Sequence, residues 1–214
     1  MKTYTHILFD LDGTLTDPKE GIINSIQYAL KRMDVKMEYH ELLHFIGPPL
    51  HKSFQTIFET EEKAFEAVAI YREYFSKKGI FENFVYNGIP ELLQSLNDKN
   101  KIVILATSKP TVYAKQILHH FNLAHYFKEI IGSNLDGTQT EKKDVITEVL
   151  NHIADVDVKK IVMIGDRKHD IIGAKHHHID SIAVSYGYGK LEELKKEEPT
   201  TIVNSVEELR LLLE

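Results

Sequence analysis

The feature that most constrains the fold is an alternation of short, continuous apolar runs with segments of helical periodicity. Each run is followed by a helical pattern, and the runs are His6–Phe9, Ile102–Ala106, Phe127–Ile131, Ile161–Ile164 and Ile179–Val184, with a weaker one at Thr201–Val203. Strands that are apolar on both faces are covered on both faces, which is typical of a parallel sheet between two layers of helices. We therefore predict an α/β fold with a parallel sheet at its core.

One long segment breaks this alternation, because the pattern from about Asp17 to about Phe84 is helical throughout. It carries two apolar stripes at helical spacing, the first made of Ile22, Ile26, Ala29, Leu30 and Met33 and the second including Ala64, Phe65, Val68, Ala69 and Phe75. Asp17 and Glu20 have the spacing of a capping box, with Pro18 at the first helical position. We expect a helical domain of residues 17–85 inserted into a core of residues 1–16 and 86–214.

Two aspartates, Asp10 and Asp12, directly follow the first apolar run. Residues two apart in an extended chain face the same side, so both carboxylates should face one spot at the end of the strand. Each disfavours the ionisation of the other. A fold tolerates such a pair when a cation lies between the carboxylates or when catalysis uses them. One aspartate can attack as a nucleophile while the other exchanges protons.

Polar residues also follow the second predicted strand of the core, at the edge where open parallel sheets bind ligands. Thr107 and Ser108 precede Pro110, which opens a helix whose N-terminus could bind phosphate. An ordinary helix N-cap is the alternative interpretation of these two hydroxyls. Lys109, between them and the proline, could help to bind a substrate, but a solvated lysine after a strand is common and is the role we favour.

Two further charged segments follow later predicted strands. In Glu141-Lys142-Lys143-Asp144, one lysine could neutralise a phosphoryl oxygen, or the whole run could be solvated. Another strand ends at Gly165-Asp166, and Asp170 follows one helical turn later. Oxygen-rich sites of this kind suit Mg²⁺, which keeps several waters and takes few carboxylates. Compensation of the helix dipole is the alternative role for Asp170.

The composition argues against several other classes of protein. The 214 residues carry a net charge of -6, so no basic footprint indicates nucleic-acid binding. No apolar stretch approaches the roughly 20 residues of a membrane span. The first strand begins too close to Met1 to leave room for a signal peptide. The chain contains no cysteine, which excludes disulfides and suits the reducing cytoplasm in which we expect it.

The four motifs, in this order, resemble the DxDGT branch of the haloacid dehalogenase (HAD) superfamily, which has a Rossmann-like core. Asp10-Leu11-Asp12-Gly13-Thr14 is the most specific of them. The helical insertion after the first motif is similar to the C1-capped branch. Three segments resemble phosphoglycolate phosphatase-type members, namely Phe45–Leu50, Thr107–Pro110 and Tyr186–Gly189. Many relatives have Lys-Pro-Asp-Pro at the third motif, where Lys142 aligns best here and Lys143 lies close by.

This resemblance implies a Mg²⁺-dependent phosphatase that acts on a small phosphorylated metabolite. Asp10 would form a phospho-aspartate and Asp12 would act as general acid and base. Thr107, the backbone of Ser108 and Lys142 would bind the phosphate. The metal-binding residues would be Asp10, Asp12 through its backbone carbonyl, Asp166, and Asp170 as a ligand or a support for one.

Several alternatives stay open at this point. The resemblance favours a phosphoglycolate phosphatase-like activity, with 5'-nucleotidase or pyrophosphatase activity as the alternative. A monomer and a homodimer are both compatible with it. A sugar-phosphate mutase is the nearest rival, but such relatives carry a histidine in the first hinge region and Thr16–Gly21 has none. A phospho-acceptor receiver module normally has its acceptor at a later strand. We expect Gly187 and Gly189 to serve a turn and His169 to be exposed.

Overall fold

The computed structural model describes residues 2–153 and 155–214. By its internal contacts the chain divides into two compact units, Met1–Asp17 with Val85–Glu214, and Pro18–Phe84. The strands β2 (Thr16–Asp17) and β3 (Phe84–Val85) pair where the chain passes between the units. No helix among the described residues combines the length and the apolar character needed to cross a membrane.

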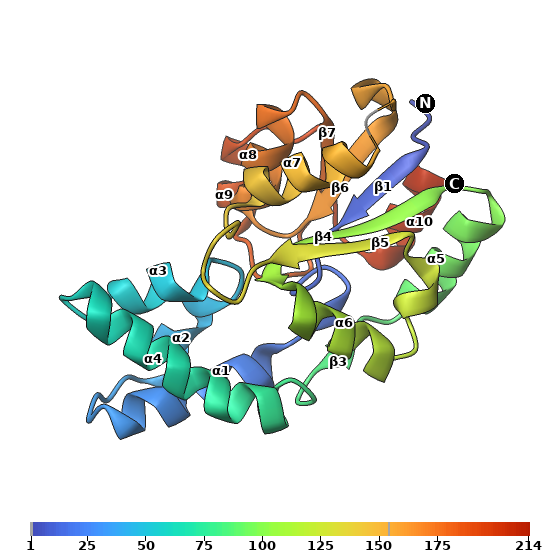
Figure 1. The fold of residues 1–214 in the computed structure, drawn as a ribbon. Helices are drawn as coiled ribbons and strands as arrows, with labels where there is room; N and C mark the ends of the chain where they lie inside the picture. The colour runs from blue at the N-terminus through green and yellow to red at the C-terminus, as the bar shows by residue number, and fades with distance from the viewer. Residues whose placement is uncertain (1, 154) are drawn as a thin grey trace. The chain divides into compact units, whose positions relative to one another are not determined.

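A six-stranded sheet in the order β5-β4-β1-β6-β7-β8 forms the centre of the larger unit (Figure 1). All of its pairings are parallel, and its strands are β1 His6–Phe9, β4 Ile102–Pro110, β5 Glu129–Ser133, β6 Ile161–Gly165, β7 Asp180–Val184 and β8 Thr201–Val203. The predicted α/β fold with a Rossmann-like parallel sheet is confirmed. β5 begins two residues later than the predicted run because a 3₁₀ turn, Ala124–Tyr126, leads into it.

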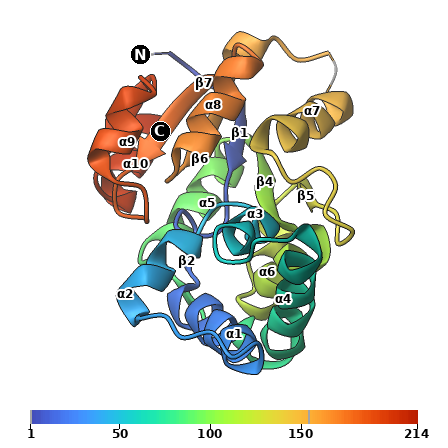
Figure 2. The ribbon, with the colours of Figure 1, turned by 90° about the vertical axis from the view of Figure 1, so that its left-hand side faces the viewer.

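Helices cover both faces of this sheet, which explains why its central strands are apolar throughout. They are α5 Ile89–Asp98, α6 Thr111–His120, α7 Lys142–His152, α8 Lys168–His176, α9 Leu191–Lys196 and α10 Val206–Leu213. Helices α7 and α8 pack together on one face, and α5, α6 and α10 lie on the other (Figures 1 and 2). Leu8 of β1 and Met163 of β6 are fully buried in the core cluster beneath α7.

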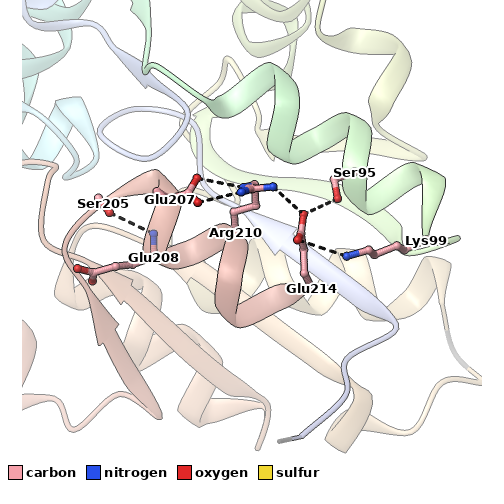
Figure 3. A network of polar contacts seen from close by, with 7 residues as sticks. All are labelled: Ser95, Lys99, Ser205, Glu207, Glu208, Arg210 and Glu214. Atoms are coloured by element: carbon pink, nitrogen blue, oxygen red, sulfur yellow. Dashed lines mark hydrogen bonds and ion pairs between the residues drawn. The ribbon is translucent and has the colours of Figure 1, made fainter.

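Helix α10 closes the larger unit by packing on α5. Its Leu209 is fully buried, whereas polar contacts line its exposed side (Figure 3). The Ser95 hydroxyl of α5 donates to Glu214 Oε1 at 2.7 Å, and Lys99 Nζ lies 3.5 Å from Glu214 Oε2. Apolar burial therefore provides the packing energy of α10, while these exposed contacts fix the end of the chain.

The smaller unit is helical, with α1 Lys19–Arg32, α2 Tyr39–Leu42, α3 Leu50–Gln55 and α4 Glu61–Tyr74, followed by a π-helical turn at Phe75–Gly79. The stripe predicted on α1 is largely buried, but the phase predicted for α4 is wrong at Phe65 and Ala69, which are exposed. The buried residues of α4 are Ala64, Ala67, Val68, Ile70 and Tyr71. The exposed Phe65 ring instead stacks on His51, with 4.0 Å between ring centroids.

The predicted capping box at the start of α1 is also wrong. Helix α1 begins at Lys19, its N-cap is Pro18, and no side chain caps it. The Asp17 carboxylate accepts a hydrogen bond from the Tyr188 hydroxyl instead. A distant tyrosine therefore binds a carboxylate that local spacing assigned to the helix terminus.

Candidate active site

The register of the sheet brings the ends of three strands to one edge. Phe9 of β1 pairs with Leu105 of β4 and with Ile164 of β6. The Asp10 N–H continues this pairing by donating to the Ile164 carbonyl oxygen at 2.9 Å. Asp10 and Asp166, which directly follow β1 and β6, and Thr107, which lies in the last part of β4, are consequently at the same edge, where parallel sheets bind ligands.

Asp10, Asp166 and Asp170 form a buried group of carboxylates. Each offers an oxygen, and these oxygens lie within 4.8 Å of one another. Asp166 Oδ1 is buried and accepts no hydrogen bond from any residue within 2–153 and 155–214. Burial raises the pKa of Asp166 well above its ordinary value, and the charges of Asp170 and Asp10 raise that pKa further. A divalent cation would supply the missing positive charge and the missing partner for Asp166, so these residues fit a metal site.

The Asp12 side chain is not a member of this group, which leaves its backbone carbonyl as the atom that Asp12 could offer to a metal. Burial raises the pKa of its carboxyl, Lys109 opposes that shift, and Asp10 adds to it. The Asp12 carboxyl therefore has a raised pKa, and Asp12 lies two residues after Asp10 in the sequence.

Lys142 is the lysine of its segment that points inward. Helix α7 begins at Lys142, so this side chain starts in the first helical turn. Its Nζ lies 2.9 Å from Asp10 Oδ1 and 2.8 Å from Asp170 Oδ1, and it donates to the Ala106 carbonyl oxygen at 2.8 Å. Lys143 is exposed. The structure thus selects Lys142 of the two and contradicts a solvated role for it.

The charges around Lys142 and Asp170 act on both pKa values. Burial alone would lower the pKa of Lys142, but the carboxylates of Asp10 and Asp170 outweigh it, so the pKa is raised. Burial raises the pKa of Asp170, and Lys142 opposes that shift. Lys142 therefore stays charged. Asp170 forms an ion pair with it, so compensation of the helix dipole is not its only role.

Two glycines allow the chain to approach Asp166 closely. Gly13 has a φ of +80°, and a Cβ there would lie 2.2 Å from Asp166 Oδ2. A Cβ at Gly187 would lie 2.4 Å from Asp166 Cβ and 2.3 Å from the Gly13 carbonyl oxygen. The next residue, Tyr188, donates its N–H to Asp166 Oδ2 at 2.7 Å. Gly187 therefore does more than form a turn, because its loop also holds the Asp166 carboxylate in place.

Thr107 and Ser108 do not cap helix α6, which contradicts the alternative raised for them from sequence. The N-cap residue of α6 is Pro110, and no side chain caps that helix. Thr107 is buried, and its Oγ1 accepts the Lys109 N–H at 3.3 Å. The Ser108 carbonyl oxygen accepts the Ser133 hydroxyl at 2.8 Å. Neighbouring backbone and β5 thus hold both residues at the strand edge.

Lys109 is buried at the site, so the solvated role favoured for it from sequence is wrong, and its contact with Asp12 was not predicted. Its side chain is only 7% exposed, and its Nζ lies 2.8 Å from Asp12 Oδ2. The pairing of β4 with β5 shifts register between Ala106 and Pro110, so the backbone leaves the regular ladder at this lysine. The available signal was its position directly after the two hydroxyl residues at a strand end.

Two tyrosines near the site, Tyr86 and Tyr186, were not predicted as site residues. The Tyr186 hydroxyl donates to the Thr14 carbonyl oxygen at 3.0 Å, and its ring packs edge-on against Tyr86 with centroids 5.1 Å apart. Burial raises the pKa of Tyr86, and the charges of Asp17, Asp166 and Asp12 raise it further. The aromatic pattern alone gave no indication that these rings gather beside the carboxylates.

Glu193 of α9 accepts two hydrogen bonds from residues at the start of α8. The Arg167 Nε donates to Glu193 Oε1 at 3.1 Å. Glu193 also accepts the Lys168 N–H at 3.1 Å, so it secures the start of α8. His169 is half-buried rather than exposed, and burial lowers its pKa, as do the nearby Arg167 and Lys168.

A family model described as haloacid dehalogenase-like hydrolase matches residues 7–184. The chain belongs to this family. The match runs from β1 through β7, so it includes Asp10, Asp12, Asp166 and Asp170 together with Lys109 and Lys142. The resemblance inferred from the four motifs is confirmed.

Individual relatives of this HAD hydrolase cover nearly its whole length. A 5'-nucleotidase of Pseudomonas aeruginosa is 46% identical over 213 residues, which are 99% of this chain and 96% of that protein. The crystal structure of a predicted phosphatase from Clostridium acetobutylicum is 47% identical, with a TM-score of 0.95 and coverage of 99% and 98%. The tyrosine-protein kinase PtkA of Mycobacterium tuberculosis is 35% identical over 95% of this chain and 70% of its own.

Proposed function

We propose that this HAD hydrolase is a Mg²⁺-dependent phosphatase that hydrolyses monoesters of small phosphorylated metabolites through a phospho-aspartate at Asp10. The observation that carries the proposal is the buried carboxylate group of Asp10, Asp166 and Asp170, with Lys142 Nζ 2.9 Å from Asp10. Asp10 provides a nucleophile, and Lys142 provides a cation beside it that can bind an anion. Phosphoryl transfer asks a protein mainly for such positioning and charge stabilisation.

The reaction follows from the roles of two aspartates. The Asp10 carboxylate attacks phosphorus as the bond from phosphorus to the leaving oxygen breaks, and Asp12 gives its proton to that oxygen. Asp12 then takes a proton from a water molecule, which attacks the phosphorus of phospho-Asp10. Phosphate leaves and the Asp10 carboxylate is regenerated. The raised pKa of Asp12 favours the protonated form that the first step requires.

The remaining site residues bind and neutralise the phosphate. Lys142, Thr107 and the Ser108 N–H would hold the transferring oxygens. Asp10, Asp166, the Asp12 carbonyl oxygen and Asp170, as a ligand or a support, would hold Mg²⁺. When bound, that ion would offset the repulsion between carboxylates and a phosphate dianion.

For the substrate, we propose nucleoside 5'-monophosphates as the first class to test. The Pseudomonas relative named 5'-nucleotidase is 46% identical. A phosphoglycolate phosphatase of Vibrio parahaemolyticus is 24% identical, and a pyrophosphatase PpaX is 29% identical. The greater similarity moves the nucleotidase activity ahead of the phosphoglycolate phosphatase activity that the motifs favoured. Phosphoglycolate and pyrophosphate belong in the same panel.

The experiment that tests this function is phosphate release from AMP by the wild-type protein and by Asp10→Asn. We expect the variant to be at least about 10³-fold slower, or roughly 4 kcal/mol in barrier, because it lacks the nucleophile. Asp98→Asn, at an exposed aspartate on α5, is the matched control and should behave as wild type.

Two outcomes of that experiment would contradict the proposal. Turnover of Asp10→Asn at the wild-type rate would remove Asp10 as the nucleophile. Transfer of phosphate from ATP to a tyrosine, with no release from monoesters, would favour the activity named for the mycobacterial relative.

A further inference from the structure

Lys109 and Asp12 form a second lysine–aspartate pair beside the one between Lys142 and Asp10. Lys109 Nζ lies 2.8 Å from Asp12 Oδ2, and the two side chains are 7% and 14% exposed. The other carboxylate oxygen, Asp12 Oδ1, is buried and accepts no hydrogen bond from the residues that the structure describes. One oxygen of Asp12 is therefore held by a cation, while the other has no partner among those residues.

We propose that Lys109 is a positioning residue, which holds Asp12 Oδ2 so that Oδ1 faces the leaving-group oxygen for proton transfer. The inference rests on the proposed function, because it assigns a support to the acid of that reaction. A carboxyl held in one rotamer delivers its proton without first losing the freedom to rotate.

The backbone around Lys109 contacts β5 and the Thr107 side chain. A Cβ at Gly132 of β5 would come within 2.3 Å of the Lys109 carbonyl oxygen, so the two strands are in close contact there. The Ser133 hydroxyl donates to the Ser108 carbonyl oxygen at 2.8 Å. The Lys109 N–H donates to Thr107 Oγ1 at 3.3 Å. The ammonium thus reaches Asp12 from a segment that β5 and Thr107 hold in place.

Lys142 does not perform this task, because its ammonium group contacts other residues of the site. Its Nζ lies 2.9 Å from Asp10 Oδ1 and 2.8 Å from Asp170 Oδ1, and it donates to the Ala106 carbonyl oxygen at 2.8 Å. The site therefore assigns one lysine to the nucleophile and the other to the acid.

The test compares leaving groups, because only poor ones need the proton. An alkyl leaving group such as the nucleoside of AMP requires protonation, whereas nitrophenolate leaves without it. For Lys109→Met, we expect the ratio of kcat on nitrophenyl phosphate to kcat on AMP to rise at least about tenfold. Lys109→Arg, which keeps a cation at this position, should restore most of the wild-type ratio.

A double-variant cycle separates positioning from phosphate binding. Asp12→Asn should abolish the effect of Lys109, so Asp12→Asn and Asp12→Asn/Lys109→Met should have the same kcat and KM within about threefold. This comparison also serves if Lys109→Met alone fails to fold, because the double variant contains no unpaired buried charge at this pair.

Three results would overturn the inference. The first is an equal loss of kcat on both leaving groups in Lys109→Met, and the second is kinetics unchanged from wild type. The third is a rise in KM that persists when Asp12 is already Asn, which would make Lys109 a phosphate-binding residue. Failure of the proposed function looks different, since the wild type would then release no phosphate or Asp10→Asn would remain active.

Discussion

Asp166 is held by neighbours that have no room for larger side chains. A Cβ at Gly187 would lie within 2.5 Å of both the Asp166 side chain and the Gly13 carbonyl oxygen, since those distances are 2.4 and 2.3 Å. The adjacent Tyr188 N–H binds Asp166 Oδ2 and leaves Oδ1 without a partner. The loop between β7 and α9 consequently decides which oxygen of Asp166 is available to a metal.

Gly187→Ala should therefore weaken metal binding. The added methyl group must displace Asp166, and changes in the groups that orient a ligand typically cost about 10–100-fold in metal affinity. Overpacking should also cost about 1–3 kcal/mol of stability. Calorimetric titration of the metal-free protein with Mg²⁺ measures the first effect without any substrate.

Gly88→Ala is the matched control for that titration. Gly88 has a φ of +86°, so alanine should destabilise the fold there, but its nearest side chain is Val206 rather than a site carboxylate. Mg²⁺ affinity should then stay at the wild-type value. Equal affinity in wild type and Gly187→Ala would show that this loop does not position Asp166.

The site residues predicted from sequence were those whose chemistry is local. Asp10 and Asp12 follow a strand at a spacing of two, and Asp166 follows another strand, so strand periodicity alone placed them at one edge. Lys109 was missed because its burial depends on a register shift between β4 and β5 that no local pattern shows. The role of Asp17 also depends on a long-range contact, because its carboxylate accepts a hydrogen bond from the Tyr188 hydroxyl and does not cap a helix.

Among the elements, the strands were more predictable than the helix faces. A continuous apolar run predicts a strand that is buried on both faces, and this prediction does not depend on which elements pack against it. A helix face depends on which side packs inward, and apolar residues on α4 are not confined to that side. Phe65 is 48% exposed while Ala67 is fully buried, so hydrophobicity alone gave the wrong phase.

Helix α10 offers a direct test of how one element is held. Leu209 is fully buried and Leu211 is 61% exposed, two residues apart on the same helix. Leu209→Ala should destabilise the larger unit by about 2–5 kcal/mol, because it loses apolar contacts and leaves a cavity. Leu211→Ala should change stability by no more than about 0.5 kcal/mol.

Urea unfolding followed by circular dichroism measures both variants. A similar midpoint for the two would show that α10 contributes little through Leu209, and that the exposed contacts of Figure 3 hold the helix instead. The wild-type curve fixes whether the two compact units unfold together, which decides how each midpoint is converted to free energy.

For the whole molecule, the site residues of the proposed mechanism all belong to the larger unit, within Met1–Asp17 and Val85–Glu214. The ionisation of the site carboxylates should therefore affect the stability of the larger unit. The role of Pro18–Phe84 as a cap domain stays a prediction, as does a monomeric or homodimeric state.

Stability should depend jointly on pH and Mg²⁺. Burial raises the pKa of both Asp166 and Asp170, so the folded metal-free protein binds protons there more tightly than the unfolded chain does. Their favourable contribution is present below the ordinary carboxyl pKa of about 4 and is lost as pH rises through the raised values. Mg²⁺ competes with these protons and needs the ionised carboxylates.

The rise in Tm on adding Mg²⁺ should therefore be larger at about pH 7.5 than at about pH 5. Thermal unfolding with and without the ion measures this difference. Asp166→Asn should reduce the increment at the higher pH, and an increment independent of both pH and Asp166 would place the ion elsewhere.

The most direct test of a covalent route through Asp10 is to trap the intermediate. Wild-type protein is mixed with a phosphate-labelled nucleoside monophosphate and Mg²⁺, quenched in acid within the first turnover, and digested. We predict label on the peptide that contains Asp10, its removal by hydroxylamine as expected of an acyl phosphate, and no label on Asp10→Asn. Rapid phosphate release without a labelled Asp10 peptide, or label on another residue, would contradict the account.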